Sequence, residues 1–320
     1  MKKDSILITT GIYPPEIGGP ATYTALVEGE LKKRGWGVAV LPFRLVRFLP
    51  SGFRHVAYVF LVLFKSFGKK YIYAQDIFSV GFPSLIAAKI LNKKFIVRVP
   101  GDFAWEQGAQ RFGVKENIDD FQNKKYGRKV EFFRKIQKRV VLGASLVVVP
   151  SDYFYNLVST WGVRKEKLIR IYNGVSVPDG LIDYKNEDKK IISAGRLVFW
   201  KGFDTLIEIV SNLPGYKLSI YGDGEDRDRL ISMIKNMGVG DRVELCGQVD
   251  RIELLSRIKS STVFVLPSMF ESFSFQTVES MAVGTPVVLY DIGNLREIVD
   301  SGESGFLVPE GDKDAVKKAI

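Results

Sequence analysis

Two glutamates, Glu271 and Glu279, lie eight positions apart in "MFESFSFQTVESMAVGTPVV" (Met269–Val288). The β-branched run "TVFVLPS" before them predicts a strand, so Glu271 is expected in the loop at its carboxyl end. Residues 272–275 would offer backbone N–H groups at a helix start, and Glu279 would lie in the first turns of that helix. Each acid alone is better explained structurally, Glu271 as a cap and Glu279 as a helix surface residue. Together they favour a site for paired sugar hydroxyls.

Two cations follow an earlier predicted strand in "SAGRLVFWKGFDTL" (Ser193–Leu206). Arg196 lies just past the strand and Lys201 follows five residues later. Arginine offers two parallel donors to phosphate oxygens and lysine a compact charge. A solvated loop would tolerate both residues equally well. The two acids described above suit sugar hydroxyls, and the two cations suit phosphate. Phosphate binding is therefore favoured, because the four residues together match a ligand that contains both a sugar and a phosphate.

A glycine pair, Gly18 and Gly19, follows the first predicted strand in "GIYPPEIGGPATYTAL". A helix is expected from about Ala21, with Pro20 suited to its first turn. Backbone N–H groups at such a place can approach an anion, although a turn that needs positive φ is an equally simple explanation. G-x-G-x-x-G and Walker A motifs are absent after the predicted strands. The G-x-G of "YGDGED" (Tyr221–Asp226) is better explained as a tight strand-to-helix turn.

The elements that must position these residues alternate between short β-branched runs and amphipathic stretches, which predicts parallel sheets covered by helices. The predicted strands are "SILITT", "KYIYAQD", "KFIVRVPGD", "SLVVVPSD", "KLIRIYNGV", "KIISAGRL", "KLSIYGDG", "RVELCGQV", "TVFVLPS", "TPVVLYD" and "SGFLVP". The predicted helices include "ATYTALVEGELKKRG", "SLIAAKILN", "KVEFFRKIQKRVVLG", "FDTLIEIVSNL" and "IELLSRIKSS".

The stretch "SVPDGLIDYKNEDKK" (Ser176–Lys190) lacks apolar periodicity and is interpreted as a linker. The predicted fold is therefore α/β, with two doubly wound Rossmann-like domains that face each other across a cleft. Residues 1–175 form the first domain, 176–190 the linker and 191–320 the second domain. Because the last helical stretch, "GDKDAVKKAI", has no stop signal, we expect a C-terminal piece to be missing.

Composition is typical of a soluble globular protein, with 46% apolar and 26% charged residues in 320. The single cysteine, Cys246, excludes an internal disulfide and indicates a reducing compartment, so we expect a cytoplasmic protein. The longest apolar run, Val56–Phe64, is far shorter than the roughly 20 residues of a membrane-spanning helix. The basic start of the chain is followed by too short an apolar run for a signal peptide.

Charge is shared unevenly along the chain. Residues 1–180 hold 29 Lys and Arg against 14 Asp and Glu, whereas residues 181–320 hold 17 against 22. Bases alternate with large apolar residues in Phe43–Lys70, and Lys124–Arg139 is strongly basic. This pattern favours an anionic membrane surface as a partner. The alternative is a buried helix at Val56–Phe64 with a solvated basic face. No recognised nucleic-acid motif accompanies the charge, so nucleic acid is not an expected partner.

The segments "PPEIGGPATY", "YNGV", "GRLVFWKGFDTLI", "IYGDGED" and "FESFSFQTVESMAVGTPVV…GFLVPEGD" resemble family 4 glycosyltransferases, which are retaining enzymes of the two-domain GT-B fold. The resemblance covers nearly the whole chain in the right order. It implies transfer of a hexosyl unit from a nucleotide-diphosphate sugar to a hydroxyl acceptor. The basic and apolar segments described above favour a lipid-linked or cell-envelope acceptor and a peripheral place on the inner membrane face. The alternatives are an inactive sugar-nucleotide binder and a nicotinamide-dependent oxidoreductase, which the missing G-x-G-x-x-G opposes.

The resemblance also implies roles for single residues. Gly18 and Gly19 would lie against the phosphates of the donor. Arg196 and Lys201 would neutralise the departing diphosphate, Glu271 would hold donor-sugar hydroxyls, and Glu279 would accept the ribose hydroxyls. Backbone around Ser274 and Phe275 would complete the cradle. The departing phosphate takes the acceptor's proton in this mechanism, which requires neither metal nor cofactor.

The chain departs from the family pattern in two places. Ser272 and Ser274 occupy positions where the family often has glycine, so the donor sugar would be held differently. The only histidine, His55, lies outside the place of the family's acceptor-side histidine and is expected to be a packing or surface residue. Asp102, in "RVPGDFAWE", is the candidate acceptor-side group, with a turn acid after Gly101 as the alternative. "DRD" (Asp226–Asp228) resembles a metal-binding D-x-D but lies at a charged helix start.

Overall fold

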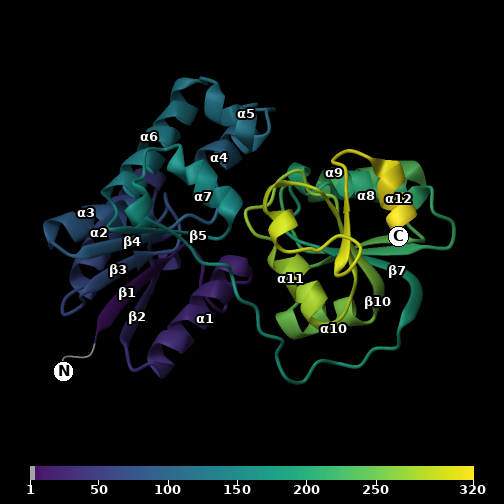
Figure 1. The fold of residues 1–320 in the computed structure, drawn as a ribbon, viewed down its shortest axis with the longest axis horizontal. Helices are drawn as coiled ribbons and strands as arrows, with labels where there is room; N and C mark the ends of the chain where they lie inside the picture. The colour runs from purple at the N-terminus through teal and green to yellow at the C-terminus, as the bar shows by residue number, and fades with distance from the viewer. Residues whose placement is uncertain (1–3) are drawn as a thin grey trace. The chain divides into compact units, whose positions relative to one another are not determined.

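The computed structural model describes residues 4–320. The chain divides into two compact units, residues 1–173 (unit 1) and residues 174–320 (unit 2). Each unit is a six-stranded parallel sheet covered by helices (Figure 1). The predicted α/β class, with two doubly wound sheets, is confirmed.

The sheet of unit 1 has the strand order β2-β1-β3-β4-β5-β6, with every neighbouring pair parallel. Its strands are β1 (Ser5–Thr10), β2 (Gly37–Pro42), β3 (Tyr71–Ala74), β4 (Lys94–Arg98), β5 (Leu146–Val149) and β6 (Leu168–Arg170). Strand β2, which forms one edge of the sheet, is not among the strands predicted from the sequence. The chain runs from β1 to one side and then to the other, so the switch point lies between β1 and β3.

The helices of unit 1 are α1 (Gly19–Lys33), α2 (Ser51–Lys65), α3 (Gly81–Ile90), α4 (Phe103–Arg111), α5 (Ile118–Asn123), α6 (Arg128–Gly143) and α7 (Asp152–Ser159), with 3-10 turns η1 (Phe43–Val46) and η2 (Lys165–Lys167). Parallel crossovers are right-handed. Helix α1 leads from β1 to β2, whereas α2, α3 and α6 lead in the opposite direction along the sheet. Helix α1 therefore covers one face of the sheet, and α2, α3 and α6 cover the other face (Figure 1).

The sheet of unit 2 has the order β12-β11-β10-β7-β8-β9, again entirely parallel. Its strands are β7 (Glu187–Ala194), β8 (Lys217–Tyr221), β9 (Val243–Gly247), β10 (Ser261–Leu266), β11 (Val287–Tyr290) and β12 (Gly305–Val308). This is the strand order of dinucleotide-binding Rossmann sheets, and its switch point lies between β7 and β10.

The helices of unit 2 are α8 (Phe203–Ser211), α9 (Arg227–Met237), α10 (Arg251–Lys259), α11 (Phe275–Ala282) and α12 (Lys313–Ala319), with 3-10 turns η3 (Phe199–Lys201) and η4 (Gly293–Glu297). Helix α8 shows why they pack as they do. Its apolar residues Phe203, Leu206, Ile207 and Val210 recur at helical spacing and are all buried. Each such burial contributes about 1.5–3 kcal/mol, which fixes α8 on the sheet against β8 and β10.

The segment that we predicted as a linker, residues 176–190, is bound along unit 2. The backbone N–H of Ile182 donates to Ser256 Oγ at 2.9 Å, and the Tyr184 hydroxyl donates to Glu253 Oε2 at 2.6 Å. Its last four residues, 187–190, are already part of strand β7. The extended segment is therefore held by α10 rather than hanging free.

Candidate functional site

The switch point of unit 2 brings two loops together. Strands β7 and β10 are parallel neighbours, so their carboxyl ends meet at the same edge of the sheet. Residues 195–202 leave β7 toward α8, and residues 267–274 leave β10 toward α11. Ligands of open parallel sheets bind at this place, because the two loops diverge from each other and leave a crevice. Most of the residues that the sequence analysis singled out in this unit lie on these loops.

A glycine holds the two loops in close approach. Gly202 has a φ of 68°, and a Cβ atom there would lie 2.1 Å from the carbonyl oxygen of Pro267. The backbone N–H of Met269 donates to the carbonyl of Trp200 at 2.8 Å. Only glycine permits both the left-handed backbone and the contact. The loop after β7 is thus fixed to the loop after β10.

Lys201 and Glu271 form an ion pair across these loops. Lys201 Nζ lies 2.5 Å from Glu271 Oε1, and the two side chains are only 13% and 6% exposed. The hydroxyl of Ser268 donates to the same oxygen at 2.8 Å. Both bonds are made to Oε1, so Oε2 is the oxygen that a ligand could use. The two residues were expected at different parts of a ligand, and they are in direct contact with each other.

Arg196 lies on the same loop and is exposed to solvent. Its guanidinium carbon is 5.5 Å from the centre of the Trp200 ring, a distance typical of a cation–π contact. Trp200 itself is buried, so it gives the arginine a fixed platform. Arg196 thus presents an exposed positive charge at the carboxyl end of β7, beside the more deeply placed Lys201.

Helix α11 begins at the end of the β10 loop, as the sequence predicts. Ser274 is its N-cap and accepts from the backbone N–H and the hydroxyl of Thr277, at 3.4 and 2.8 Å. Phe275 is the first helical residue, and its ring packs edge-on against that of Phe273, which is buried. The free backbone N–H groups of this first turn carry the positive end of the helix dipole. They lie directly after the loop that carries Glu271.

Glu279 is buried and has a partner that the sequence analysis missed. Arg251, the first residue of α10, donates from Nε to Glu279 Oε1 at 2.7 Å. The same guanidinium donates to the carbonyl of Ser176 at 2.6 Å. Arg251 follows Asp250, the N-cap of α10, and in the sequence it looks like any exposed helix residue. Only the packing of α10 against α11 reveals its role.

The glycines of "YGDGED" close a tight turn, as predicted. A Cβ atom on Gly222 would lie 1.9 Å from the carbonyl oxygen of Gly195, and one on Gly224 would lie 2.3 Å from that of Leu197. These glycines therefore support the loop that carries Arg196. Asp226, the first acid of "DRD", pairs with Arg229 Nε at 2.5 Å. This ion pair is a structural role for the acid.

In unit 1, the glycine pair lies at the start of α1. Gly18 is the N-cap, with a φ of 148°, and Gly19 is the first helical residue, followed by Pro20. The carbonyl of Gly18 accepts from Ala21 N at 3.0 Å. The helix starts two residues earlier than predicted, because proline and glycine both suit its first turn. Gly18 and Gly19 lie after β1, at the switch point of this sheet.

Asp102 is fully buried and its carboxylate is occupied. It is the N-cap of α4, where Oδ1 accepts from Trp105 N at 3.0 Å and from Gln137 Nε2 at 3.1 Å. Its Oδ2 accepts from Gln122 Nε2 at 2.9 Å. Burial raises the pKa of Asp102 despite these donors. The geometry favours the turn acid over the acceptor-side group that we named first.

His55 is half-buried on α2. Its Nδ1 lies 2.9 Å from the carbonyl oxygen of Ser51, and its ring packs against Phe43 and Phe78 at 5.4 and 5.6 Å between centres. Burial lowers the pKa of His55. These contacts are those of a packing residue.

Asp76 is a further acid, at the switch point of unit 1, that the sequence did not single out. It follows β3, and a Cβ atom on Gly11, which follows β1, would lie 2.9 Å from its Oδ2. Its Oδ1 accepts from Val80 N at 3.1 Å, just before α3. Burial raises the pKa of Asp76 to about 6, against the lowering effect of neighbouring backbone N–H groups. This carboxyl group therefore changes charge close to neutral pH.

Arg98, at the end of β4, is a buried cation that was also missed. It is 3% exposed, and its guanidinium lies 4.0 Å from the centre of the Tyr23 ring and donates to Asn173 Oδ1 at 3.0 Å. Its NH1 and the Nδ2 of Asn173 have no hydrogen-bond partner among residues 4–320. Burial lowers the pKa of Arg98. Such a guanidinium is costly to bury without an anion or other acceptors.

Comparison with known proteins finds a family model that matches most of unit 2. Residues 182–320 match the family described as Glycosyl transferases group 1. The lipopolysaccharide core biosynthesis glycosyltransferase LpsE of Rhizobium meliloti is 36% identical over 169 residues, which cover 51% of this chain and 49% of LpsE. A glycogen synthase of Mycobacterium tuberculosis is 34% identical over 183 residues, covering 55% of this chain and 44% of the synthase. The chain thus spans about half the length of these curated relatives.

Solved structures resemble the chain over both units. A sucrose-phosphate synthase from Thermosynechococcus elongatus matches with a TM-score of 0.77 and 20% identity, over 99% of this chain and 89% of the synthase. HepE from Anabaena, solved in complex with UDP-glucose, matches with a TM-score of 0.71 and 19% identity, over 98% of this chain and 88% of HepE. This likeness shows the GT-B fold that the resemblance implied. The match to the glycosyl transferases group 1 family covers residues 182–320, the part of the chain that carries Lys201 and Glu271.

Proposed function

We propose that this chain carries the core of a retaining glycosyltransferase, which moves a hexosyl unit from a nucleotide-diphosphate sugar to a hydroxyl acceptor without a metal ion or cofactor. The observation that carries the proposal is the buried Lys201–Glu271 ion pair at the switch point of unit 2. A fixed carboxylate and a fixed cation side by side match a ligand in which a sugar is joined to a phosphate.

The donor site follows from the contacts around this pair. Glu271 Oε2 accepts from hydroxyls of the transferred sugar, while Lys201, Arg196 and the first backbone N–H groups of α11, around Ser274 and Phe275, receive the diphosphate. Glu279, held by Arg251, accepts from the ribose hydroxyls. HepE, which has a similar fold, was solved with UDP-glucose, and this supports a nucleotide-sugar donor.

Transfer breaks the bond between the anomeric carbon and the phosphate oxygen, and the electron pair leaves with the nucleotide diphosphate. A bond from the acceptor oxygen to the same face of that carbon replaces it, and the acceptor's proton passes to the departing phosphate oxygen. The protein's task is to stabilise the growing negative charge, which Lys201 and Arg196 do. One such preorganised donor is worth on the order of 3 kcal/mol in the transition state.

We assign residues 1–175 to an acceptor-side domain, 176–190 to the linker and 191–320 to the donor domain. In unit 1, Gly18 and Gly19 supply backbone contact to phosphate. The acceptor class is a lipid-linked or cell-envelope glycan, as the name of LpsE, a lipopolysaccharide core enzyme, supports. The corresponding location is the cytoplasmic side of the membrane.

The proposal is tested by nucleotide release from UDP-, GDP- and ADP-sugars, with total lipid extract as acceptor and EDTA present. Lys201→Ala and Glu271→Ala are compared with Lys235→Ala and Glu244→Ala, which change exposed residues of the same unit. We expect release from one donor class, lost in the first pair of variants and retained in the second. Saturable nucleotide binding without release would indicate an inactive binder, and no binding of any nucleotide would overturn the assignment of the donor site.

A further inference from the structure

Helix α2 carries a row of exposed apolar side chains on its outer side. Phe53, Val56, Phe60 and Phe64, followed by Phe67 just after the helix, recur at intervals of three or four residues and therefore share one side of the helix. Phe60 is 66% exposed, Phe64 76% and Phe67 90%. Tyr58 and Val62, on the inner side, are fully buried. We call the five exposed residues the apolar row. Contiguous exposed apolar surface of this kind marks a docking site.

The segment around the apolar row contains bases but no acid. Residues 43–70 include six Lys and Arg and neither Asp nor Glu. Arg44 and Arg47 pair with Glu16 outside the segment, and Lys70 pairs with Asp4. Arg54 and Lys65, which flank the apolar row, have no ion pair within residues 4–320. The surface that surrounds the row is therefore positive.

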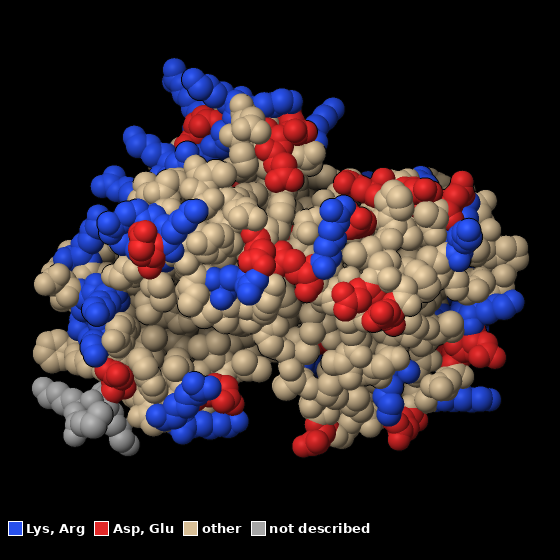
Figure 2. All heavy atoms as spheres, in the orientation of Figure 1, with Lys and Arg blue, Asp and Glu red and all other residues tan. Residues whose placement is uncertain are grey.

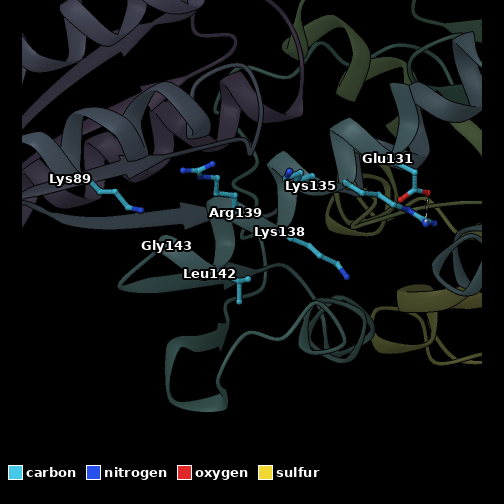
Figure 3. Close-up of a pocket in the computed structure, with 8 residues that line it drawn as sticks. Lys89, Glu131, Lys135, Lys138, Arg139, Leu142 and Gly143 are labelled. Carbon is cyan, nitrogen blue, oxygen red and sulfur yellow. Dashed lines mark hydrogen bonds and ion pairs between the residues drawn. The ribbon is translucent and has the colours of Figure 1, made fainter. Parts of the chain in front are cut away.

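A basic cavity of about 700 Å³ lies nearby, between α3 and α6. Its lining residues are Lys89, Glu131, Arg134, Lys135, Lys138, Arg139, Leu142 and Gly143. Glu131 is neutralised by Arg134 at 3.1 Å. Figure 3 shows Lys89 from α3 and Arg139 from α6 extending toward each other. Like charges that converge in this way repel unless an anion lies between them, so the cavity is suited to a phosphate group.

The apolar row and the basic cavity belong to one layer of helices. Helix α2 packs on α3 and α3 packs on α6, all on the same face of the sheet. Figure 2 shows Lys and Arg side chains gathered over the part of unit 1 where α3 and α6 lie. Exposed apolar residues continue across this layer, with Ile90 at the end of α3 and Phe132 and Leu142 on α6. Cations and apolar side chains are thus interleaved over the whole layer.

We propose that this layer of unit 1 docks on an anionic membrane surface, with the apolar row of α2 inserted at the headgroup–acyl boundary and the basic cavity on lipid phosphates. A protein partner is the poorer match, because protein interfaces are depleted of lysine in their cores. An interfacial helix combines a large aromatic side with flanking cations, and α2 has this composition. The inference goes beyond the proposed function, since docking requires no turnover.

The test is co-sedimentation with vesicles of phosphatidylcholine alone and of phosphatidylcholine with about 30% phosphatidylglycerol, at low and high salt. We expect binding to the anionic vesicles only, weakened by salt. The double variants Phe60→Ser/Phe64→Ser and Lys135→Glu/Lys138→Glu should each reduce binding by at least about tenfold. Phe306→Ser and Lys235→Glu, at exposed positions of unit 2, are the matched controls and should bind as the unchanged protein does.

Insertion is measured separately with a tryptophan at the apolar row. Fluorescence of Phe60→Trp, after subtraction of the four native tryptophans, should shift to the blue and be quenched by lipids brominated on the acyl chain. Phe306→Trp should show neither change. Because the folded state of each variant is checked by circular dichroism, loss of binding through unfolding is distinguished from loss of the docking surface.

Three results would overturn the proposal. The first is the absence of binding to anionic vesicles. The second is a concentration-dependent dimer that the Phe60→Ser/Phe64→Ser variant abolishes without any vesicle binding, which would assign the row to a second copy of the chain. The third is RNA binding that depends on Lys135 and Lys138 but not on the row. Nucleotide binding by unit 2 is measured in parallel, so that failure of docking and failure of the donor site are seen independently.

Discussion

Lys201 Nζ lies 2.5 Å from Glu271 Oε1, although the two residues are 70 positions apart in the chain. The contact exists because β7 and β10 are neighbours at the switch point. Both side chains are nearly excluded from water, and Ser268 binds the same carboxylate oxygen. The pair therefore joins the loop after β7 to the loop after β10, and its contribution to stability can be measured.

Removal of one partner should destabilise the protein more than removal of both. Lys201→Ala or Glu271→Ala leaves a charge nearly buried and unpaired, at a cost of about 2 kcal/mol. Urea unfolding of both single variants and the double variant gives the coupling energy of the pair. If the losses of unfolding free energy in the two single variants add up to the loss in the double variant, the pair contributes no coupling energy. The exposed pair Lys259–Asp183, whose side chains are 47% and 86% exposed, is the control, and its cycle should give a coupling of less than about 1 kcal/mol.

Gly202→Ala should separate the two loops at the switch point. The new Cβ would clash with Pro267 O in addition to the strain of a positive φ. Gly238→Ala is the matched control, because its φ of 63° is nearly the same and no atom lies within 4 Å of its Cβ. We expect about 1 kcal/mol of destabilisation at Gly238 and at least about twice that at Gly202. Equal losses measured by urea unfolding would contradict the role given to the close approach.

Arg251→Ala should weaken nucleoside diphosphate binding but leave pyrophosphate binding unchanged. The substitution frees Glu279 from the bond that orients it toward the ribose, whereas the phosphate-binding groups are untouched. We expect a loss of affinity of about tenfold in calorimetric titration, equivalent to about 1.4 kcal/mol. Arg257→Ala, on the same helix, removes a pair with Glu253 and should leave both affinities unchanged. A parallel loss of pyrophosphate binding would place Arg251 at the phosphates instead.

Asp76 should make stability depend on pH between about 4 and 6. Its pKa is raised from 3.8 to about 6 in the folded state, so the unfolded chain loses its proton first as pH rises. The favourable contribution is complete below pH 3.8 and is lost as pH rises through about 6. The unchanged protein should therefore lose stability relative to Asp76→Asn over this range, by no more than about 3 kcal/mol.

Unfolding free energies of both proteins at pH 4 and pH 7 check this sign. A carbon NMR titration of the Asp76 carboxyl with its midpoint near 6 would provide direct support. A difference between the two proteins that is constant with pH would show that the pKa of Asp76 is the same in the folded and unfolded states.

Most of the fold could be predicted because each buried strand is a short β-branched run. Strand β2 was missed because "GVAVLP" begins with glycine, ends with proline and is only partly buried along its first four residues. The site residues in loops could be found from their types after strands. The pairing of Lys201 with Glu271 could not, since it depends on strand order. Arg251 and Arg98 were missed for the same reason, because their significance arises from burial against distant elements.

The adjacency of β7 and β10 also has a consequence for synthesis. When Lys201 leaves the ribosome, the partner strand of β7 on this side, Ser261–Leu266, has not been made. At translation rates of about 10 residues per second, roughly 7 s separate the appearance of Lys201 from that of Glu271. During that interval β7 can pair with β8, and β8 with β9, whereas the other edge of β7 stays open to the solvent or to a chaperone. The ion pair thus forms late, and until β10 is made the nascent chain carries an unpaired side of β7 that is open to other strands.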